Sequence, residues 1–139
     1  MIPISVAALL VRENRILLGK RRAGAMVGRW ELPGGKCELG ESPEEALHRE
    51  LLEELRVDVK VGNHYVTVPF FHRGRERELR VFRVHETAPG WEAPENLPEH
   101  TKTGWFTSEE LEKMHAVLVD SDREALTRVM ESKLLFRSV

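Results

Sequence analysis

The sequence has a single cysteine, few aromatic residues and almost no net charge. Only Cys37 is a cysteine, so no disulfide can form within the chain, and 6% of the 139 residues are aromatic. The formal net charge of -2 gives no long-range attraction to nucleic acid or to an anionic membrane. The sequence shows no charged-then-apolar leader and no run of about 18 apolar residues. We therefore expect a cytoplasmic protein that binds neither a nucleic acid polymer nor a membrane.

The sequence does contain enough apolar residues to form a core. Hydrophobic residues make up 41% of the chain and charged residues 32%, which is unlike the composition of a disordered protein. The length is near the commonest size of a domain, and no repeat, low-complexity tract or linker interrupts it. These features predict one domain over residues 1–139.

Charges of opposite sign are segregated along the chain. Residues 12–29 carry six arginines and lysines against one glutamate, a local charge of +5. Residues 36–54 carry seven glutamates against one lysine and one arginine, a local charge of -5. Such clusters can bind a divalent metal and a polyanion together, but two solvated faces would give the same counts. The charges alone leave both interpretations open.

Apolar alternation and turn residues predict several strands. They are expected at residues 2–11, 16–18, 58–71, 78–85 and 103–107, with a short extended piece within 30–35. The turn residues Glu13-Asn14-Arg15 join the first two strands into a hairpin.

Capping signals predict three helices. Ser42, Pro43 and Glu45 favour a helix over 43–55, because serine and glutamate form a capping box and proline fits the first turn. A short helix is expected over 108–115 and a terminal helix over 121–130, the latter from a capping box of Ser121 and Glu124. Strands and helices mixed in this order predict an α/β sandwich.

The helix over 43–55 carries an unusual acidic face. Glu50, Glu53 and Glu54 stand at positions i, i+3 and i+4, so their carboxylates share one face of the helix. Crowded carboxylates repel unless they are solvated or neutralised, and their oxygens suit Mg²⁺ or Mn²⁺. Arg49 precedes Glu53 by four residues and can orient it. A solvated acidic face is the alternative interpretation.

The spacing around this helix resembles the signature of the Nudix hydrolase family. Gly35 is followed after five residues by Glu41, and after seven more by the stretch R-E-L-L-E-E-L-R-V at 49–57. The preceding W-E-L-P-G-G-K at 30–36 resembles the branch that contains MutT-type and CTP-type pyrophosphohydrolases. The resemblance implies an α/β/α sandwich with a mixed sheet, a metal-binding loop-helix-loop and a C-terminal helix.

One position departs from the family pattern. Arg56 stands where the family has a glycine, just after the helix. A left-handed residue commonly ends a helix there, and a residue other than glycine pays about 1 kcal/mol for that conformation. We expect the departure to affect the local turn and the stability, and to leave the metal ligands intact.

The resemblance assigns roles around a Mg²⁺ ion, for which Mn²⁺ can substitute. The metal ligands it implies are Glu50, Glu53, Glu54 and the carbonyl of Gly35. Glu41 is expected to hold the loop to the helix, and Arg49 to orient the catalytic glutamates. Many members add a carboxylate from a later loop as a metal ligand or general base, and Glu99 matches it. Glu53 is the competing general base, and the sequence does not choose between the two.

The resemblance also implies substrate contacts. In similar enzymes an arginine at the end of the second strand touches phosphate, which points to Arg22 or Lys20. Leu32 matches a side chain that lines the base pocket, and Asp120 or Asp122 can read the base edge. Each has a plainer alternative: a solvated strand end, a core leucine or a helix cap.

The implied activity is Mg²⁺-dependent hydrolysis of a nucleoside triphosphate to the monophosphate and pyrophosphate. Its substrate would be a ribo- or deoxyribonucleotide, including an oxidised or otherwise modified one. The alternative is the same chemistry on a nucleoside diphosphate linked to another group, such as ADP-ribose, a nucleotide sugar or a dinucleoside polyphosphate. A non-catalytic Nudix-fold module is a third hypothesis, although such proteins usually lose signature glutamates and this chain retains them. Many relatives dimerise, so a homodimer is a candidate assembly.

Overall fold

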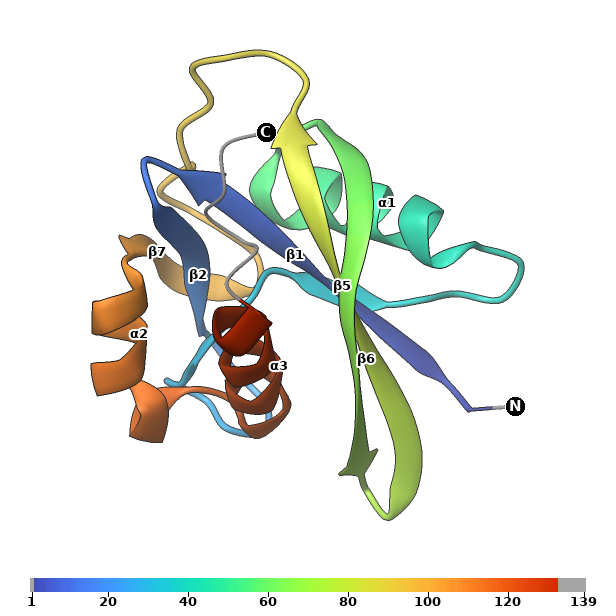
Figure 1. Cartoon of the computed structure of the whole chain (residues 1–139). Helices are drawn as coiled ribbons and strands as arrows, with labels where there is room; N and C mark the ends of the chain where they lie inside the picture. Colours follow the sequence, from blue (N-terminus) through green and yellow to red (C-terminus); the bar gives the residue numbers. More distant parts are fainter. Residues whose placement is uncertain (1, 133–139) are drawn as a thin grey trace.

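The computed structural model describes residues 2–132 (Figure 1). Along the chain lie β1 (Ile4–Arg12), β2 (Arg15–Arg21), β3 (Trp30–Glu31), β4 (Gly34–Lys36), α1 (Pro43–Leu55), β5 (Val59–His72), β6 (Arg75–Glu86), β7 (His100–Phe106), α2 (Ser108–Lys113), the 3₁₀ helix η1 (His115–Val117) and α3 (Asp120–Ser132). Within this range no helix has the length and apolar character needed to cross a membrane.

The strands form a mixed sheet, as predicted. Its order is β3-β2-β1-β6-β5, with β4 joined to β1 and β7 joined to β2. β1 and β6 run parallel, in a register from Ile4 opposite Glu78 to Leu10 opposite Val84. The other strand pairs are antiparallel. The central strand β1 therefore has a neighbour on each side and is buried in the middle of the molecule.

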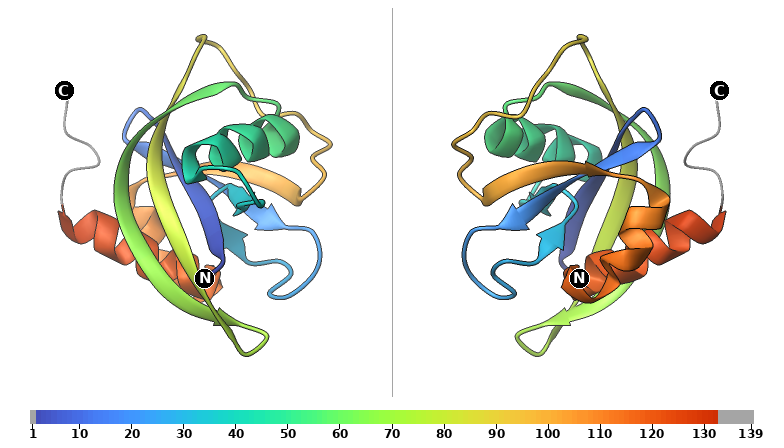
Figure 2. Two further views of the ribbon diagram at one scale, coloured as in Figure 1. Left: turned by 90° about the vertical axis from the view of Figure 1, so that its right-hand side faces the viewer. Right: turned by 90° about the vertical axis from the view of Figure 1, so that its left-hand side faces the viewer.

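Helices cover both faces of the sheet and make the predicted α/β/α sandwich. Val6, Ala8 and Leu10 of β1 pack in one cluster with the apolar side of α1. Ala7 and Leu9 point to the other face and pack with residues of α2 and α3. This follows from the period-two alternation of a strand that is buried on both sides. Figure 2 shows α1 and α3 on opposite sides of the strands.

Helix α1 has the predicted bounds, and its capping box is formed. The Ser42 hydroxyl accepts a hydrogen bond from the backbone N–H of Glu45 at 3.1 Å, and the Glu45 carboxylate accepts one from the N–H of Ser42 at 3.0 Å. Pro43 occupies the first turn. The buried stripe consists of Leu47, Leu51 and Leu55. The helix is thus anchored to the sheet on one side, which leaves its acidic face free for other contacts.

The predicted hairpin of the first two strands is also present. Val11 pairs with Ile16 across the two-residue turn region of Glu13 and Asn14, both of which have positive φ (51° and 61°). Positive φ at both turn residues gives the twist that a two-residue hairpin favours.

Several strands and helices begin or end one to three residues from the predicted positions, and two of these differences bear on the site. β7 begins at His100 rather than at residue 103, because Thr101 and Lys102 are exposed and give no apolar signal. α3 begins at Asp120, so Ser121 lies inside the first turn. Its hydroxyl donates to Asp122 Oδ1 at 3.1 Å, so the predicted cap at Ser121 is wrong.

The residue that departs from the family pattern adopts the left-handed conformation. Arg56 has φ 53° and ψ 39°, and its N–H donates to carbonyls of the last turn of α1. The cost of this conformation arises from contact between Cβ and the backbone, which glycine lacks.

We expect Arg56→Gly to stabilise the protein. The change should raise the free energy of unfolding by roughly 1 kcal/mol, which corresponds to a rise in Tm of about 2–5 °C. Arg56→Ala is the matched control, because the Cβ of alanine also disfavours the left-handed conformation, so this variant should show no comparable rise in Tm. An unchanged or lower Tm for the glycine variant in calorimetry would contradict this explanation.

Candidate functional site

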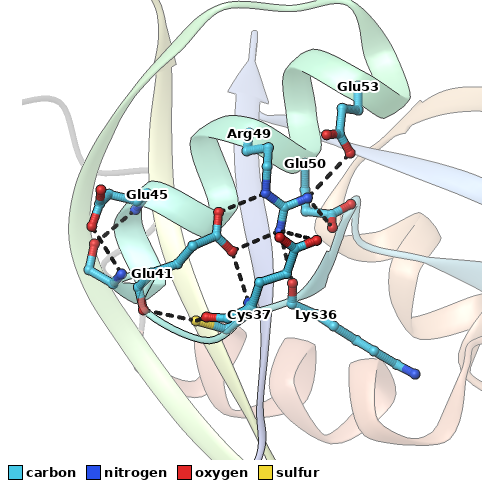
Figure 3. A network of polar contacts seen from close by, with 9 residues as sticks. Lys36, Cys37, Glu41, Glu45, Arg49, Glu50 and Glu53 are labelled. Atoms are coloured by element: carbon cyan, nitrogen blue, oxygen red, sulfur yellow. Dashed lines mark hydrogen bonds and ion pairs between the residues drawn. The ribbon is translucent and has the colours of Figure 1, made fainter.

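Arg49 joins the acidic face of α1 to the loop that precedes the helix (Figure 3). Its Nε and Nη2 donate to the two carboxylate oxygens of Glu41 at 2.7 and 2.9 Å. Its Nη1 donates to Glu50 at 2.9 Å and to Glu53 at 3.3 Å, and its Nη2 also donates to the carbonyl of Lys36 at 3.1 Å. One guanidinium therefore fixes the loop and two of the three glutamates on the acidic face of α1.

Glu41 is fixed on the loop side as well. Its Oε1 accepts a hydrogen bond from the N–H of Glu38 at 2.9 Å. The hydrogen bonds from Arg49, together with this one, lower the pKa of Glu41 to about 2. Glu41 is therefore ionised, and its contacts link the loop to the helix.

Glu54 and Glu50 form a crowded acidic wall on the helix. Glu54 is only 8% exposed and accepts a hydrogen bond from the N–H of Gly34 at 3.3 Å. Burial, followed by the charges of Glu50 and Glu31, raises the pKa of Glu54 to about 9. Burial also raises the pKa of Glu50, against the opposing effect of Arg49. Two carboxyl groups held together in this way resist being ionised at the same time unless a cation lies beside them.

Gly35 lies against this wall. A Cβ atom at this position would overlap the carboxylate of Glu50 and would force that side chain to move, so glycine lets the carboxylate lie directly against strand β4. The backbone of β4 and the carboxylates of α1 consequently share one small region.

A cavity of about 380 Å³ opens beside the acidic wall. Of the predicted site residues it is lined by Gly35, Leu32, Glu54 and Glu99. Glu54 lies on α1, whereas Glu99 comes from the loop that precedes β7. The fold therefore brings together an acidic helix and a later acidic loop that are distant in the sequence.

The basic residues predicted to meet phosphate do not line the cavity. The guanidinium of Arg22 donates to the carbonyls of Leu97 and His100, each at 3.1 Å, and so holds the later loop in place. Lys20 is likewise absent from the lining, whereas Arg21 is part of it. A register shift between Lys20 and Arg21 interrupts the strand alternation, so no local pattern in the sequence singles out Arg21.

The two candidate aspartates of α3 differ sharply. Asp122 lines the cavity, is 5% exposed, and its Oδ2 accepts a hydrogen bond from the N–H of Leu32 at 2.8 Å. Asp120 is exposed and pairs with Arg29 and Arg123, each at 3.2 Å. Of the two alternatives left open by the sequence, only Asp122 lies in the cavity with Leu32.

The expected metal ligands are partly gathered. Glu50 and Glu54 lie together, whereas the side chain of Glu53 is 60% exposed and Glu99 belongs to another loop. Within residues 2–132, no three His, Cys, Asp or Glu side chains are arranged to hold a metal ion as they stand. The chemistry of the donors nevertheless fits a hard divalent cation, because Glu50 and Glu54 bring the oxygens of two partly buried carboxyl groups together and burial raises the pKa of both.

Three cavity features escaped the sequence reasoning. Glu31 and Arg77 both line the cavity, and His100 is buried directly behind Glu31. Glu31 stands inside the W-E-L-P-G-G-K stretch, so its place beside Leu32 was a usable signal. Arg77 and His100 come from other strands, and only the sheet register brings them here.

Comparisons with known proteins agree with this geometry. A family model described as NUDIX domain matches residues 1–129. The chain is 36% identical over 111 residues to a CTP pyrophosphohydrolase of Escherichia coli, covering 76% of each protein. It is 34% identical over 125 residues to a putative 8-oxo-dGTP diphosphatase 2 of Mycobacterium tuberculosis, covering 84% of this chain and 82% of the relative.

Solved structures give the same result. The crystal structure of a MutT protein from Methanosarcina mazei superposes with a TM-score of 0.78 at 27% identity, covering 95% of each chain. A MutT Nudix hydrolase from Burkholderia pseudomallei superposes with a TM-score of 0.76 at 29% identity, covering 93% of this chain and 98% of that one. Sequence motif, fold and relatives together show that this chain belongs to the NUDIX domain family and is a Nudix hydrolase.

Proposed function

We propose that this protein is a Mg²⁺-dependent nucleoside triphosphate pyrophosphohydrolase. The observation that carries the proposal is the cavity, which joins Glu54 on the acidic wall to Leu32 and Asp122 within one space of about 380 Å³. A volume of this size lies in the range of small-molecule sites. The names of the relatives, a CTP pyrophosphohydrolase and a putative 8-oxo-dGTP diphosphatase, support this substrate class. The products would be a nucleoside monophosphate and pyrophosphate.

The family generally uses divalent metal ions, and we assign Mg²⁺ to the acidic wall. Glu50, Glu53 and Glu54 with the carbonyl of Gly35 would hold the ion. Bound Mg²⁺ would neutralise phosphate charge, stabilise the leaving pyrophosphate and acidify a bound water. Arg49 keeps the carboxylates oriented through its contacts with Glu50 and Glu53.

Cations on the cavity wall are suited to the phosphate chain. Arg21 and Arg77 line the cavity, and Arg77 is oriented by a hydrogen bond to Ser5 Oγ at 3.1 Å. We assign phosphate contacts to these two, while the contact expected for Lys20 or Arg22 stays a prediction. Guanidinium groups suit this task because they bind phosphate oxygens in a fixed geometry.

Leu32 and Asp122 are suited to the nucleobase. Leu32 offers an apolar surface. Asp122 offers a buried carboxyl group, which is held in place by the hydrogen bond that it accepts from the Leu32 N–H. Burial, followed by the negative charge of Glu31, raises the pKa of Asp122 to about 7. A carboxyl group whose pKa lies near the working pH can donate a hydrogen bond when it is protonated and accept one when it is ionised. We propose that Asp122, rather than Asp120, reads the base edge.

The general base is assigned to Glu99. It lines the cavity, whereas Glu53 is exposed and bonded to Arg49. A base needs to reach the attacking water, so a carboxylate on the cavity wall is better placed than one in solvent. The cytoplasmic location and the homodimer expected from the sequence stay predictions.

A substrate panel tests the proposal. With Mg²⁺ the protein should convert one or more of CTP, dCTP, dGTP and 8-oxo-dGTP to the monophosphate, with pyrophosphate rather than phosphate detected as the second product. Glu54→Gln should lower kcat roughly 100-fold or more, because it removes a charged metal ligand. Glu109→Gln, an exposed acid in the first turn of α2, is the matched control. Turnover of ADP-ribose alone, or full activity of Glu54→Gln, would contradict the proposal.

The choice of general base has its own test. Glu99→Gln should lower kcat by about 10²–10⁴-fold, as expected for loss of a general base, and Glu53→Gln should have the smaller effect. Both rates are measured at saturating nucleotide and Mg²⁺, with Tm as a check on folding. A larger loss for Glu53→Gln would assign the base to Glu53 instead.

Asp122 makes stability depend on pH. Because the pKa is raised to about 7 from an ordinary 3.8, the folded state keeps a proton that the unfolded state loses. The stability gained from the protonated group is full below pH 3.8 and is lost as the pH rises to about 7. Asp122→Asn stays neutral throughout, so its Tm should gain on that of the wild type by several degrees between pH 5 and pH 8, at roughly 1.4 kcal/mol per pKa unit. The control Asp120→Asn should show no such trend, and a constant Tm difference for Asp122→Asn would refute the assignment.

A further inference from the structure

A buried polar chain runs behind the cavity wall. His100 is 1% exposed, and its Nε2 lies 3.0 Å from Glu31 Oε2. The other oxygen of Glu31 accepts a hydrogen bond from Arg21 Nε at 2.7 Å, and Arg21 Nη1 donates to the carbonyl of Ala25 at 2.7 Å. Each oxygen of Glu31 thus has one donor, and a carboxylate oxygen can accept more than one hydrogen bond.

The sheet is shaped to hold this histidine. Lys20 pairs with Lys102, but the next residue, Arg21, pairs with His100, so Thr101 is the extra residue of a bulge in β7. Gly19 on β2 makes the space for the ring, since a Cβ atom there would lie 2.5 Å from its carbon atoms. The bulge at Thr101 and the glycine at position 19 together make room for the His100 side chain.

The environment of the ring fixes which nitrogen carries the proton. His100 Nδ1 is buried and has no hydrogen-bond partner among residues 2–132. Leaving a buried N–H without an acceptor costs the full free energy of its desolvation, and folded proteins leave buried donors unpaired more rarely than buried acceptors. The unpartnered Nδ1 is therefore the nitrogen without a proton. The proton is therefore on Nε2, and His100 donates to Glu31.

Glu31 lies on the cavity wall, close enough to Glu54 and to Asp122 to act on both. It lines the cavity, and its charge acts on both Glu54 and Asp122. It is also the neighbour in sequence of Leu32, the apolar surface assigned to the base. A nucleotide that spans the cavity would meet this carboxylate in the orientation set by its two donors.

We propose that His100 is a positioning residue for nucleotide binding, which acts by holding the Glu31 carboxylate in place with its Nε2–H. The inference rests on the proposed function and adds a residue outside the motif. Contacts of the substrate away from the reacting phosphate act equally in the ground state and the transition state, so their loss raises KM and leaves kcat nearly unchanged.

Three substitutions separate positioning from packing. His100→Phe keeps the ring and removes the donor, so KM should rise about 10-fold while kcat stays within about 3-fold. His100→Gln carries an amide N–H near the position of Nε2 and should restore KM to within about 3-fold of the wild type. His100→Asn is the matched control, because its shorter amide reproduces Nδ1 and does not reach Glu31. In a Glu31→Gln background, His100→Phe should change KM no further.

The measurements are KM, kcat, Tm and the calorimetric Kd for CTP and 8-oxo-dGTP. An active wild type with an unchanged KM in His100→Phe would overturn the inference. Equal losses in His100→Phe and His100→Gln would also overturn it, since packing alone would then explain them. A wild type that binds a nucleotide without cleaving it would contradict the proposed function alone, and Kd would then replace KM in the comparison.

Discussion

The repulsion between carboxyl groups on one side of the sheet is the constraint on which the site depends. Glu31 lies on β3, and Glu50 and Glu54 lie one turn apart on α1. Burial raises the pKa of Glu50 and of Glu54. Arg49 offsets only part of this charge, since its guanidinium is shared with Glu41 and Glu53. Ionising such a cluster is unfavourable because its carboxylates are partly buried and repel one another, and a hard divalent cation bound between them would remove this repulsion.

The fold tolerates this cluster because α1 is anchored to the sheet from its opposite side. The leucine stripe of the helix is buried against β1, and the capping box fixes its first turn. The sheet then supplies the remaining walls: β4 approaches through Gly35, and the start of α3 is tied to β3 by the Leu32–Asp122 hydrogen bond and by the bond from Val119 N–H to the Trp30 carbonyl. The acidic wall on α1 and Asp122 on α3 therefore come from layers on opposite faces of the sheet (Figure 2) and meet at the cavity.

Local signals made much of this predictable from the sequence. Ser42, Pro43 and Glu45 located α1, and the spacing of its glutamates located the acidic wall, because helix periodicity is a short-range property. Contacts between distant segments were not accessible in this way. The bulge that turns His100 toward Glu31, and the register that selects Arg21 over its basic neighbours, depend on pairing between β2 and β7. Asp122 could not be separated from Asp120 until the start of α3 was known.

The central claim is that the acidic wall is built to bind a divalent cation, and calorimetric titration of the nucleotide-free protein with Mg²⁺ and Mn²⁺ tests it most directly. The account predicts saturable binding by the wild type and by Glu44→Gln, whose carboxylate is exposed on the same helix. It predicts that Glu54→Gln, correctly folded by its Tm, loses most of the affinity. Equal binding by Glu54→Gln, or no saturable binding by the wild type, would contradict it.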